Sequence, residues 1–184
     1  NVDYVMVNDI TGLPAIKLLE ELNAQPIPEK VVLIPDHYVP NKDIASAEQA
    51  KVMREFVRKY DLPYYYEVGR GGVCHQVMIE EGFVAPGRLI VGADSHTTTY
   101  GAFGAFSTGI GSTEAAYAMV TGKLWFKVPE SLKIIVNGKP RDFVCGKDII
   151  LHIIGDIGVD GALYKSMEFY GNVFNKLSLS DRIT

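Results

Sequence analysis

The sequence predicts an α/β fold, with a mostly parallel sheet and helices on both of its faces. Short apolar runs that suit buried strands alternate along the chain with segments whose apolar residues recur at helical spacing. The connections between them are short, and this pattern is typical of βαβ units. A chain of 184 residues that is 47% apolar and 22% charged can bury a sizeable core. We therefore expect residues 1–184 to form a single α/β domain.

The first part of the chain supplies the clearest elements. Residues 4–7 and 31–34 are apolar runs, and the second is continuous, as in a parallel strand buried on both faces. A helix is expected from Thr11, with Pro14 in its first turn, because the leucines and isoleucines that follow form one stripe. Residues 43–60 carry apolar side chains at helical spacing between charged ones, which predicts an amphipathic helix.

The later elements follow from the same patterns. Asn137-Gly138 is a turn dipeptide, and it predicts a hairpin near residues 132–144. The expected strands are residues 64–68, 89–91, 124–128 and 132–136, and the expected helices are residues 112–121 and 147–154.

Charge and composition limit the partners. The net charge is −4 and the basic residues are scattered, whereas nucleic acid or an anionic membrane would favour a concentrated basic face. No apolar run reaches the roughly 20 residues that cross a bilayer, and the N-terminus does not resemble a signal peptide. We expect a cytoplasmic protein that binds neither nucleic acid nor membrane. The two cysteines are too few for a disulfide framework or an all-cysteine metal site.

Polar side chains follow several of the expected strands. Asn8-Asp9, Asp36-His37 and Asp94-Ser95-His96 each come directly after an apolar run, and His75 lies in a glycine-rich segment after another. Ligands of parallel sheets bind outside the carboxyl ends of the strands, so these side chains should converge on one edge. Three of the four histidines fall here. The fourth, His152, lies in an apolar helix and is expected to be structural.

The pairing of imidazole with carboxylate predicts a catalytic or ligand-binding site. A carboxylate beside a histidine fixes its tautomer and favours its protonated form, which suits a general acid near neutral pH. His37, His75 and His96 are the candidates. Two chemistries fit a small anionic substrate here. One is dehydration beside a Lewis-acid centre, and the other is hydrolysis at a zinc ion bound directly by Asp36, His37, His75 and Asp94. A third interpretation, a non-catalytic interaction domain, also stays open.

The glycines after His96 allow two interpretations. They can bring the backbone close to a ligand, with Ser112 as the N-cap of a helix whose N-terminus attracts an anion. Alternatively, they permit close packing between the loop and the helix. The sequence has neither a phosphate-binding loop with its lysine nor a strand-Gly-x-Gly-x-x-Gly fingerprint, which argues against nucleotide binding.

The segment from Val91 to Glu114, VGADSHTTTYGAFGAFSTGIGSTE, closely resembles the signature of the aconitase family. The similarity continues upstream through VCHQ at residues 73–76 and the pair Asp36-His37, and downstream through segments within residues 121–171, so it covers essentially the whole chain. Thr99 stands where aconitases proper carry Asn, which favours the branch that acts on isopropylmalate or homoaconitate. The resemblance implies a reversible dehydration and hydration that moves a hydroxyl between neighbouring carbons of a hydroxy di- or tricarboxylate.

The resemblance also implies roles for the Asp and His residues of this edge. Asp36 and His37 would be the acid pair that helps the hydroxyl leave. His75 would pair with Asp94, and His96 would hydrogen-bond near the cofactor and the substrate.

Four further residues are implied as site residues. Ser95 would contact either the substrate or solvent near the iron of the cofactor, and Thr99 lies in the same substrate-binding segment. Glu168 matches the family's active-site glutamate. Asn8 stands where the family often has Gln or His, and a substrate contact is expected there too.

The resemblance implies a cofactor and a partner as well. In the family, a [4Fe-4S] cluster has one iron without a cysteine ligand, and that iron binds the substrate hydroxyl and a carboxylate. The cluster cysteines lie further along the family's chains, and Cys74 and Cys145 do not match their motifs. The chain is thus expected to be an N-terminal portion of a longer large subunit, inactive alone and binding no metal or cluster by itself. A separate small subunit would form a heterodimer or heterotetramer with it and supply the serine base and the arginines for the distal carboxylate.

Overall fold

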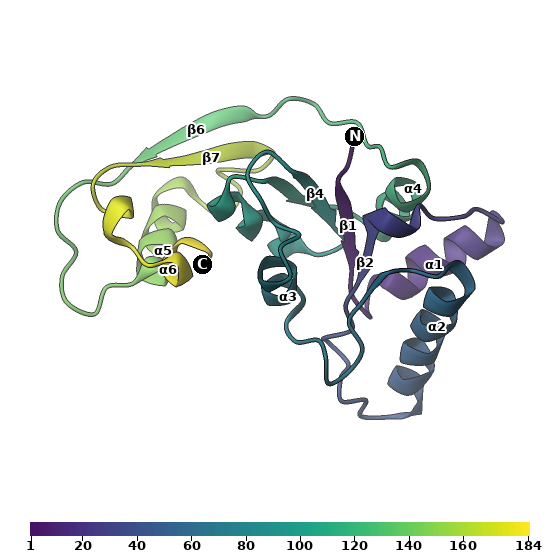
Figure 1. The fold of residues 1–184 in the computed structure, drawn as a ribbon. Coiled ribbons are helices and arrows are strands. Elements are labelled where there is room, and N and C mark those ends of the chain that lie inside the picture. Colours follow the sequence, from purple (N-terminus) through teal and green to yellow (C-terminus); the bar gives the residue numbers. More distant parts are fainter. The chain divides into compact units, whose positions relative to one another are not determined.

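The computed structural model describes residues 1–184, and the chain forms two compact units, Asn1–Leu124 and Trp125–Thr184. The expectation of one domain stays a prediction. The first unit contains a five-stranded parallel sheet in the order β3-β2-β1-β4-β5 (Figure 1), which confirms the predicted α/β fold. Its strands are β1 (Tyr4–Val7), β2 (Val31–Leu33), β3 (Tyr64–Tyr65), β4 (Leu89–Gly92) and β5 (Phe106–Gly109).

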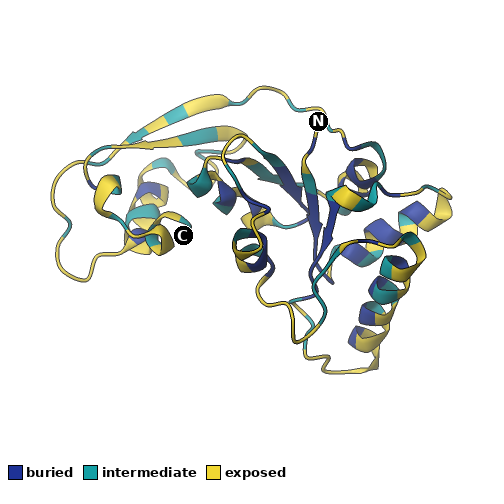
Figure 2. Cartoon of the chain, in the orientation of Figure 1, coloured by how far each residue is buried: buried dark blue, intermediate teal, exposed yellow.

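Helices cover both faces of this sheet. Successive residues of a strand point to opposite faces. In β1, where Val5, Met6 and Val7 are buried, Met6 points away from the face of Val7. Met6 belongs to a core cluster that also contains residues of α3 (Cys74–Glu80) and η2 (Ser95–Phe103). Val7 faces α1 (Gly12–Glu21) and α2 (Ile44–Tyr60), and α4 (Ser112–Thr121) packs against α1. Figure 2 shows the resulting buried sheet, as parallel sheets require.

The long helix α2 has well-defined ends. The side chain of Asp43 accepts a hydrogen bond from the Ser46 backbone N–H at 2.8 Å, and the Ser46 hydroxyl bonds back to Asp43, so that the two form a capping box. The helix ends at Tyr60, and its C-cap residue Asp61 adopts a left-handed conformation with φ 51°. A short 3₁₀ turn, η1 (Pro28–Lys30), leads into β2. No helix of the structure is long and apolar enough to cross a membrane.

Besides η1, three elements of the first unit were not expected from the sequence. Helix α3, the 3₁₀ helix η2 and strand β5 lie in segments that the sequence presents as glycine-rich loops. Strand β5 has the sequence FSTG and lies at the sheet edge, where backbone pairing with β4 holds it without an apolar run. Helix α4 begins at Ser112, so its N-cap is Gly111 and not the predicted Ser112.

The second unit is a small βαβ arrangement. Its parallel strands pair Glu130 with Lys165 and Ile135 with Tyr170. The remaining segments are two short helical turns near the C-terminus. The elements are β6 (Glu130–Ile135), α5 (Gly146–Ile157), β7 (Lys165–Tyr170), η3 (Phe174–Lys176) and α6 (Leu179–Arg182).

The predicted hairpin near residues 132–144 is wrong, because β6 pairs with β7 in parallel and not with the segment that follows it. The turn dipeptide is present, but it is tied to the end of β7. The Asn137 side chain accepts from the Asn172 N–H at 3.2 Å, and the Gly138 N–H donates to the Asn172 side chain at 2.9 Å. The strand expected over residues 124–128 is also absent, and those residues form an irregular connection.

Gly92 gives a test of the packing at the end of β4. A Cβ at this position would overlap Thr97 Oγ1 and lie 3.0 Å from Met6 Cε. Gly92→Ala is therefore expected to lower the free energy of unfolding by about 1–3 kcal/mol. Gly101→Ala is the control, because a Cβ there meets nothing within 4 Å, and it should change stability by less than about 1 kcal/mol. Urea unfolding of both variants measures the two changes in the free energy of unfolding. Equal changes would contradict the close packing inferred at Gly92.

Candidate active site

The predicted polar side chains meet at the carboxyl ends of three neighbouring strands. Asn8 and Asp9 follow β1, Asp36 and His37 follow β2, and Asp94 to His96 follow β4. His75 reaches the same place from the first turn of α3. The predicted convergence on one sheet edge is therefore confirmed by the geometry.

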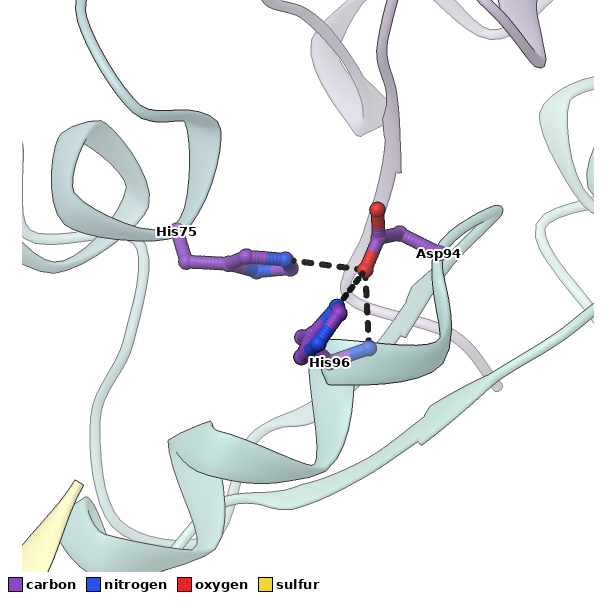
Figure 3. Close-up of side chains that lie close together, drawn as sticks. All are labelled: His75, Asp94 and His96. Atoms are coloured by element: carbon purple, nitrogen blue, oxygen red, sulfur yellow. Dashed lines mark hydrogen bonds and ion pairs between the residues drawn. The ribbon is translucent and has the colours of Figure 1, made fainter. Parts of the chain in front are cut away.

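Asp94 is the centre of this cluster (Figure 3). Its Oδ1 atom lies 3.0 Å from His75 Nε2 and 3.1 Å from His96 Nδ1, and it accepts the His96 backbone N–H at 2.7 Å. Burial acts to raise the pKa of Asp94, but the hydrogen bonds from the His96 N–H and from His75 outweigh it and hold the pKa below its ordinary value. The carboxylate is thus ionised and positioned by protein donors.

The Asn8 side chain forms a hydrogen bond with the Asp94 carboxylate. The amide is buried, and its Nδ2 donates to Asp94 Oδ2 at 3.3 Å. Its Oδ1 accepts the backbone N–H groups of Ile10 and Thr11, each at 3.1 Å, at the start of α1. Both ends of the side chain are therefore engaged inside the protein. The predicted substrate contact of Asn8 stays a prediction.

His37 and Asp36 form a close pair. His37 Nδ1 lies 2.5 Å from Asp36 Oδ1, and the other Asp36 oxygen accepts the Cys74 backbone N–H at 2.7 Å. His37 Nε2 lies 3.9 Å from Asp94 Oδ2, which is too far for a hydrogen bond. The His37 side chain is 35% exposed, so its outer nitrogen can meet a ligand.

Sequence reasoning left Asp9 and Tyr100 without a role. The buried Asp9 carboxylate accepts the backbone N–H groups of Asp36, His37 and Tyr38 at 3.3, 3.0 and 2.7 Å, and so fixes the loop that carries the acid pair. Tyr100 places its hydroxyl 2.9 Å from His75 Nδ1. The position of Asp9 directly after β1 was a usable signal, whereas nothing in the sequence distinguishes Tyr100 from a core aromatic.

The glycine-rich segment shapes a hollow beside Asp94 with a volume of about 490 Å³. Ser95 and Thr98 line it, whereas Thr99 is not among the lining residues. Gly109 allows a close approach, because a Cβ there would lie 2.7 Å from the Asp94 carbonyl oxygen. Close packing is therefore one function of these glycines. The complete lining is Ala93, Asp94, Ser95, Thr98, Thr108, Gly109, Ile110 and Gly111.

Two predicted positions lie in the second unit. Glu168, on β7, accepts hydrogen bonds from the Ser131 and Tyr170 hydroxyls, each at 2.8 Å, and these bonds hold its pKa below the ordinary value. Its active-site role stays a prediction. His152 is 82% exposed on α5 and lies 3.8 Å from Asp156 Oδ2. It takes part in no cluster of ligating side chains.

The donor set of the first unit suits a cation better than an iron–sulfur cluster. His75, Asp94 and His96 place ligand atoms within 4.8 Å of one another, and Asp9, Asp36 and His37 do the same. Cys74 is buried, and burial raises the pKa of its thiol. Cys145, in the second unit, donates its thiol to Asp148. Clusters are held by several cysteine thiolates, so the cysteines of this chain do not fit a [4Fe-4S] ligand set.

Fold and site together define an α/β protein with an Asp/His ligand site at the carboxyl ends of a parallel sheet. The chain belongs to the aconitase family (aconitate hydratase), whose sequence profile matches residues 1–184.

Its relatives include large subunits of 3-isopropylmalate dehydratase. The protein of that name from Caldicellulosiruptor saccharolyticus is 56% identical over 186 aligned positions, which cover 100% of this chain and 43% of the relative. Those from Thermodesulfovibrio yellowstonii and Picrophilus torridus are 54% and 55% identical, over 100% of this chain and 44% of each relative. The chain thus spans less than half the length of these relatives.

The lowered pKa of Asp94 predicts a pH-dependent contribution to stability. A carboxyl group with a depressed pKa in the folded state stabilises the fold above its unfolded pKa of about 3.9. That contribution is lost as the pH falls through the folded-state pKa. Asp94→Asn should therefore be less stable than the unmodified protein at pH 5–7, and the difference should shrink below about pH 4. Urea unfolding across this pH range measures the difference in stability. A difference that stays constant with pH would contradict the lowered pKa of Asp94.

Proposed function

We propose that the chain forms one wall of the active site of a [4Fe-4S]-dependent hydro-lyase, as part of the large subunit of 3-isopropylmalate dehydratase or homoaconitase. The supporting observation is the Asp94 carboxylate with His75 and His96 bound to one oxygen, beside the Asp36–His37 pair. The match of the aconitase family profile along residues 1–184 supports a hydro-lyase role for this arrangement.

The reaction needs two proton transfers. In the dehydration direction, a hydroxyl leaves as water after taking a proton from an acid, and a base removes a proton from the neighbouring carbon. His37 is the proposed acid, since its Nδ1 faces Asp36 and its Nε2 is not hydrogen-bonded within the protein. Asp36 stabilises the protonated ring, and Asp9 keeps the loop in place through the backbone. In the hydration direction the same pair accepts the proton back.

In the proposed enzyme, cysteines of the longer large subunit would hold the cluster, because Cys74 and Cys145 do not fit its ligand set. When bound, such a cluster would supply Lewis-acid chemistry toward the substrate hydroxyl and a carboxylate. Within this chain, His96 and Ser95 would face that centre, and Glu168 and Thr99 would complete the contacts to the substrate. The base and the arginines for the distal carboxylate would come from a separate small subunit. We propose that the assembled enzyme works in the cytoplasm on a small hydroxy-acid.

A zinc-dependent hydrolase is the second candidate. The two groups of Asp and His with ligand atoms within 4.8 Å are compatible with a divalent cation. This alternative requires zinc bound directly by side chains among Asp36, His37, His75 and Asp94, whereas the hydro-lyase needs these side chains as hydrogen-bonding groups.

The test is histidine replacement in the cluster-loaded large subunit assembled with its small subunit. His37→Asn should lower kcat at least about a hundredfold, because a general acid contributes roughly 10²–10⁴-fold. Formation of the unsaturated intermediate from 2-isopropylmalate or homocitrate can be followed by its ultraviolet absorbance.

His152→Asn is the matched control, because His152 is exposed on α5 and bonds to no site residue. It should leave kcat and KM unchanged. Equal activity of the His37 and His152 variants would remove His37 from the mechanism. Stoichiometric zinc in the purified protein, with loss of hydrolysis rather than dehydration on removal of zinc, would favour the second candidate.

A further inference from the structure

Tyr100 contacts the side of the His75 ring that faces away from Asp94. It lies on η2, is fully buried in the core cluster, and places its hydroxyl 2.9 Å from His75 Nδ1. The two ring centroids are 5.6 Å apart, and the rings are tilted by 57°. A buried phenol hydroxyl needs a hydrogen-bond partner, and His75 is the partner that the fold provides.

The two nitrogens of His75 face partners of different kinds. Nε2 lies 3.0 Å from Asp94 Oδ1, and an ionised carboxylate accepts hydrogen bonds but cannot donate them. The contact with Asp94 therefore favours the tautomer in which a neutral His75 ring carries its proton on Nε2. Nδ1 is then an acceptor, and the Tyr100 O–H can donate to it. Burial raises the pKa of Tyr100, so the phenol keeps the proton that this bond uses.

We propose that Tyr100 is a positioning residue that holds His75 in the tautomer protonated on Nε2, with its ring directed at Asp94. In the other tautomer, His75 would turn an unprotonated nitrogen toward the carboxylate, and the two lone pairs would repel each other. Asp94 would then lose one of the donors that orient it for His96. The effect on catalysis rests on the proposed function, whereas the effect on the histidine does not.

The direct test is ¹⁵N NMR of the histidine ring nitrogens at a pH where His75 is neutral. The unmodified protein should show Nε2 protonated and Nδ1 unprotonated. Tyr100→Phe removes only the hydroxyl, and it should give a mixture of the two tautomers. Tyr66→Phe is the matched control, because Tyr66 packs against the same core cluster while its hydroxyl donates to Glu81 at 3.1 Å. Its His75 signals should match those of the unmodified protein.

A kinetic arm uses the cluster-loaded enzyme assembled with its small subunit. Tyr100→Phe should lower kcat about tenfold, with KM changed by less than about twofold, which is the size of effect that loss of an outer positioning bond produces. Tyr66→Phe should change neither constant.

Three outcomes distinguish a failure of the positioning role of Tyr100 from a failure of the proposed function. If Tyr100→Phe lowers the melting temperature but leaves the His75 tautomer and kcat unchanged, Tyr100 is structural and the proposal is overturned. It is also overturned if His75 carries its proton on Nδ1 in the unmodified protein, a result that needs no variant. If the tautomer shifts as expected but the unmodified assembly has no dehydratase activity, the proposed function fails and the positioning role is supported.

Discussion

The site depends on the hydrogen bonds that the Asp94 carboxylate accepts. One oxygen accepts from His75 and His96, and the other accepts from the Asn8 amide. These donors come from α3, from η2 and from the end of β1, which are far apart in the sequence and are brought together because parallel strands end at the same edge of the sheet. An ionised group that is surrounded by protein donors stays in place without a ligand, so the histidines are arranged before any substrate binds.

Asp9 and Asp36 fix the acid pair by a different means. Asp9 is buried, and its carboxylate accepts three backbone N–H groups and lies 3.8 Å from His37 Nδ1. One carboxylate oxygen of Asp36 contacts His37, and the other accepts the backbone N–H of Cys74. Asp36 therefore links the end of β2 to α3. As a result, the His37 backbone is hydrogen-bonded to Asp9 while its side chain stays 35% exposed. This combination is what a proton donor to a bound hydroxyl requires.

The sequence predicted the parts of the structure that have a local signal. The continuous apolar runs at residues 4–7 and 31–34 and the amphipathic pattern of α2 were sufficient to place those elements, and polar residues directly after strands located the site. Strand β5 could not be predicted, because the pairing of its backbone with β4 depends on a distant segment. The hairpin failed for the same reason: Asn137 turns the chain but bonds to Asn172, which is 35 residues further along. Tyr100 looks like a core aromatic until His75 is placed beside it.

The most direct test of the central claim is the metal content of the protein after anaerobic reconstitution with iron and sulfide. This chain and a version extended to the full length of its relatives would be compared by iron analysis, zinc analysis and the broad visible absorption of a [4Fe-4S] cluster. If this chain forms one wall of a dehydratase site, the extended protein should bind a cluster and this chain should bind none. Its two cysteines lie in separate units. Tightly bound zinc in this chain, with no cluster in either protein, would contradict the account.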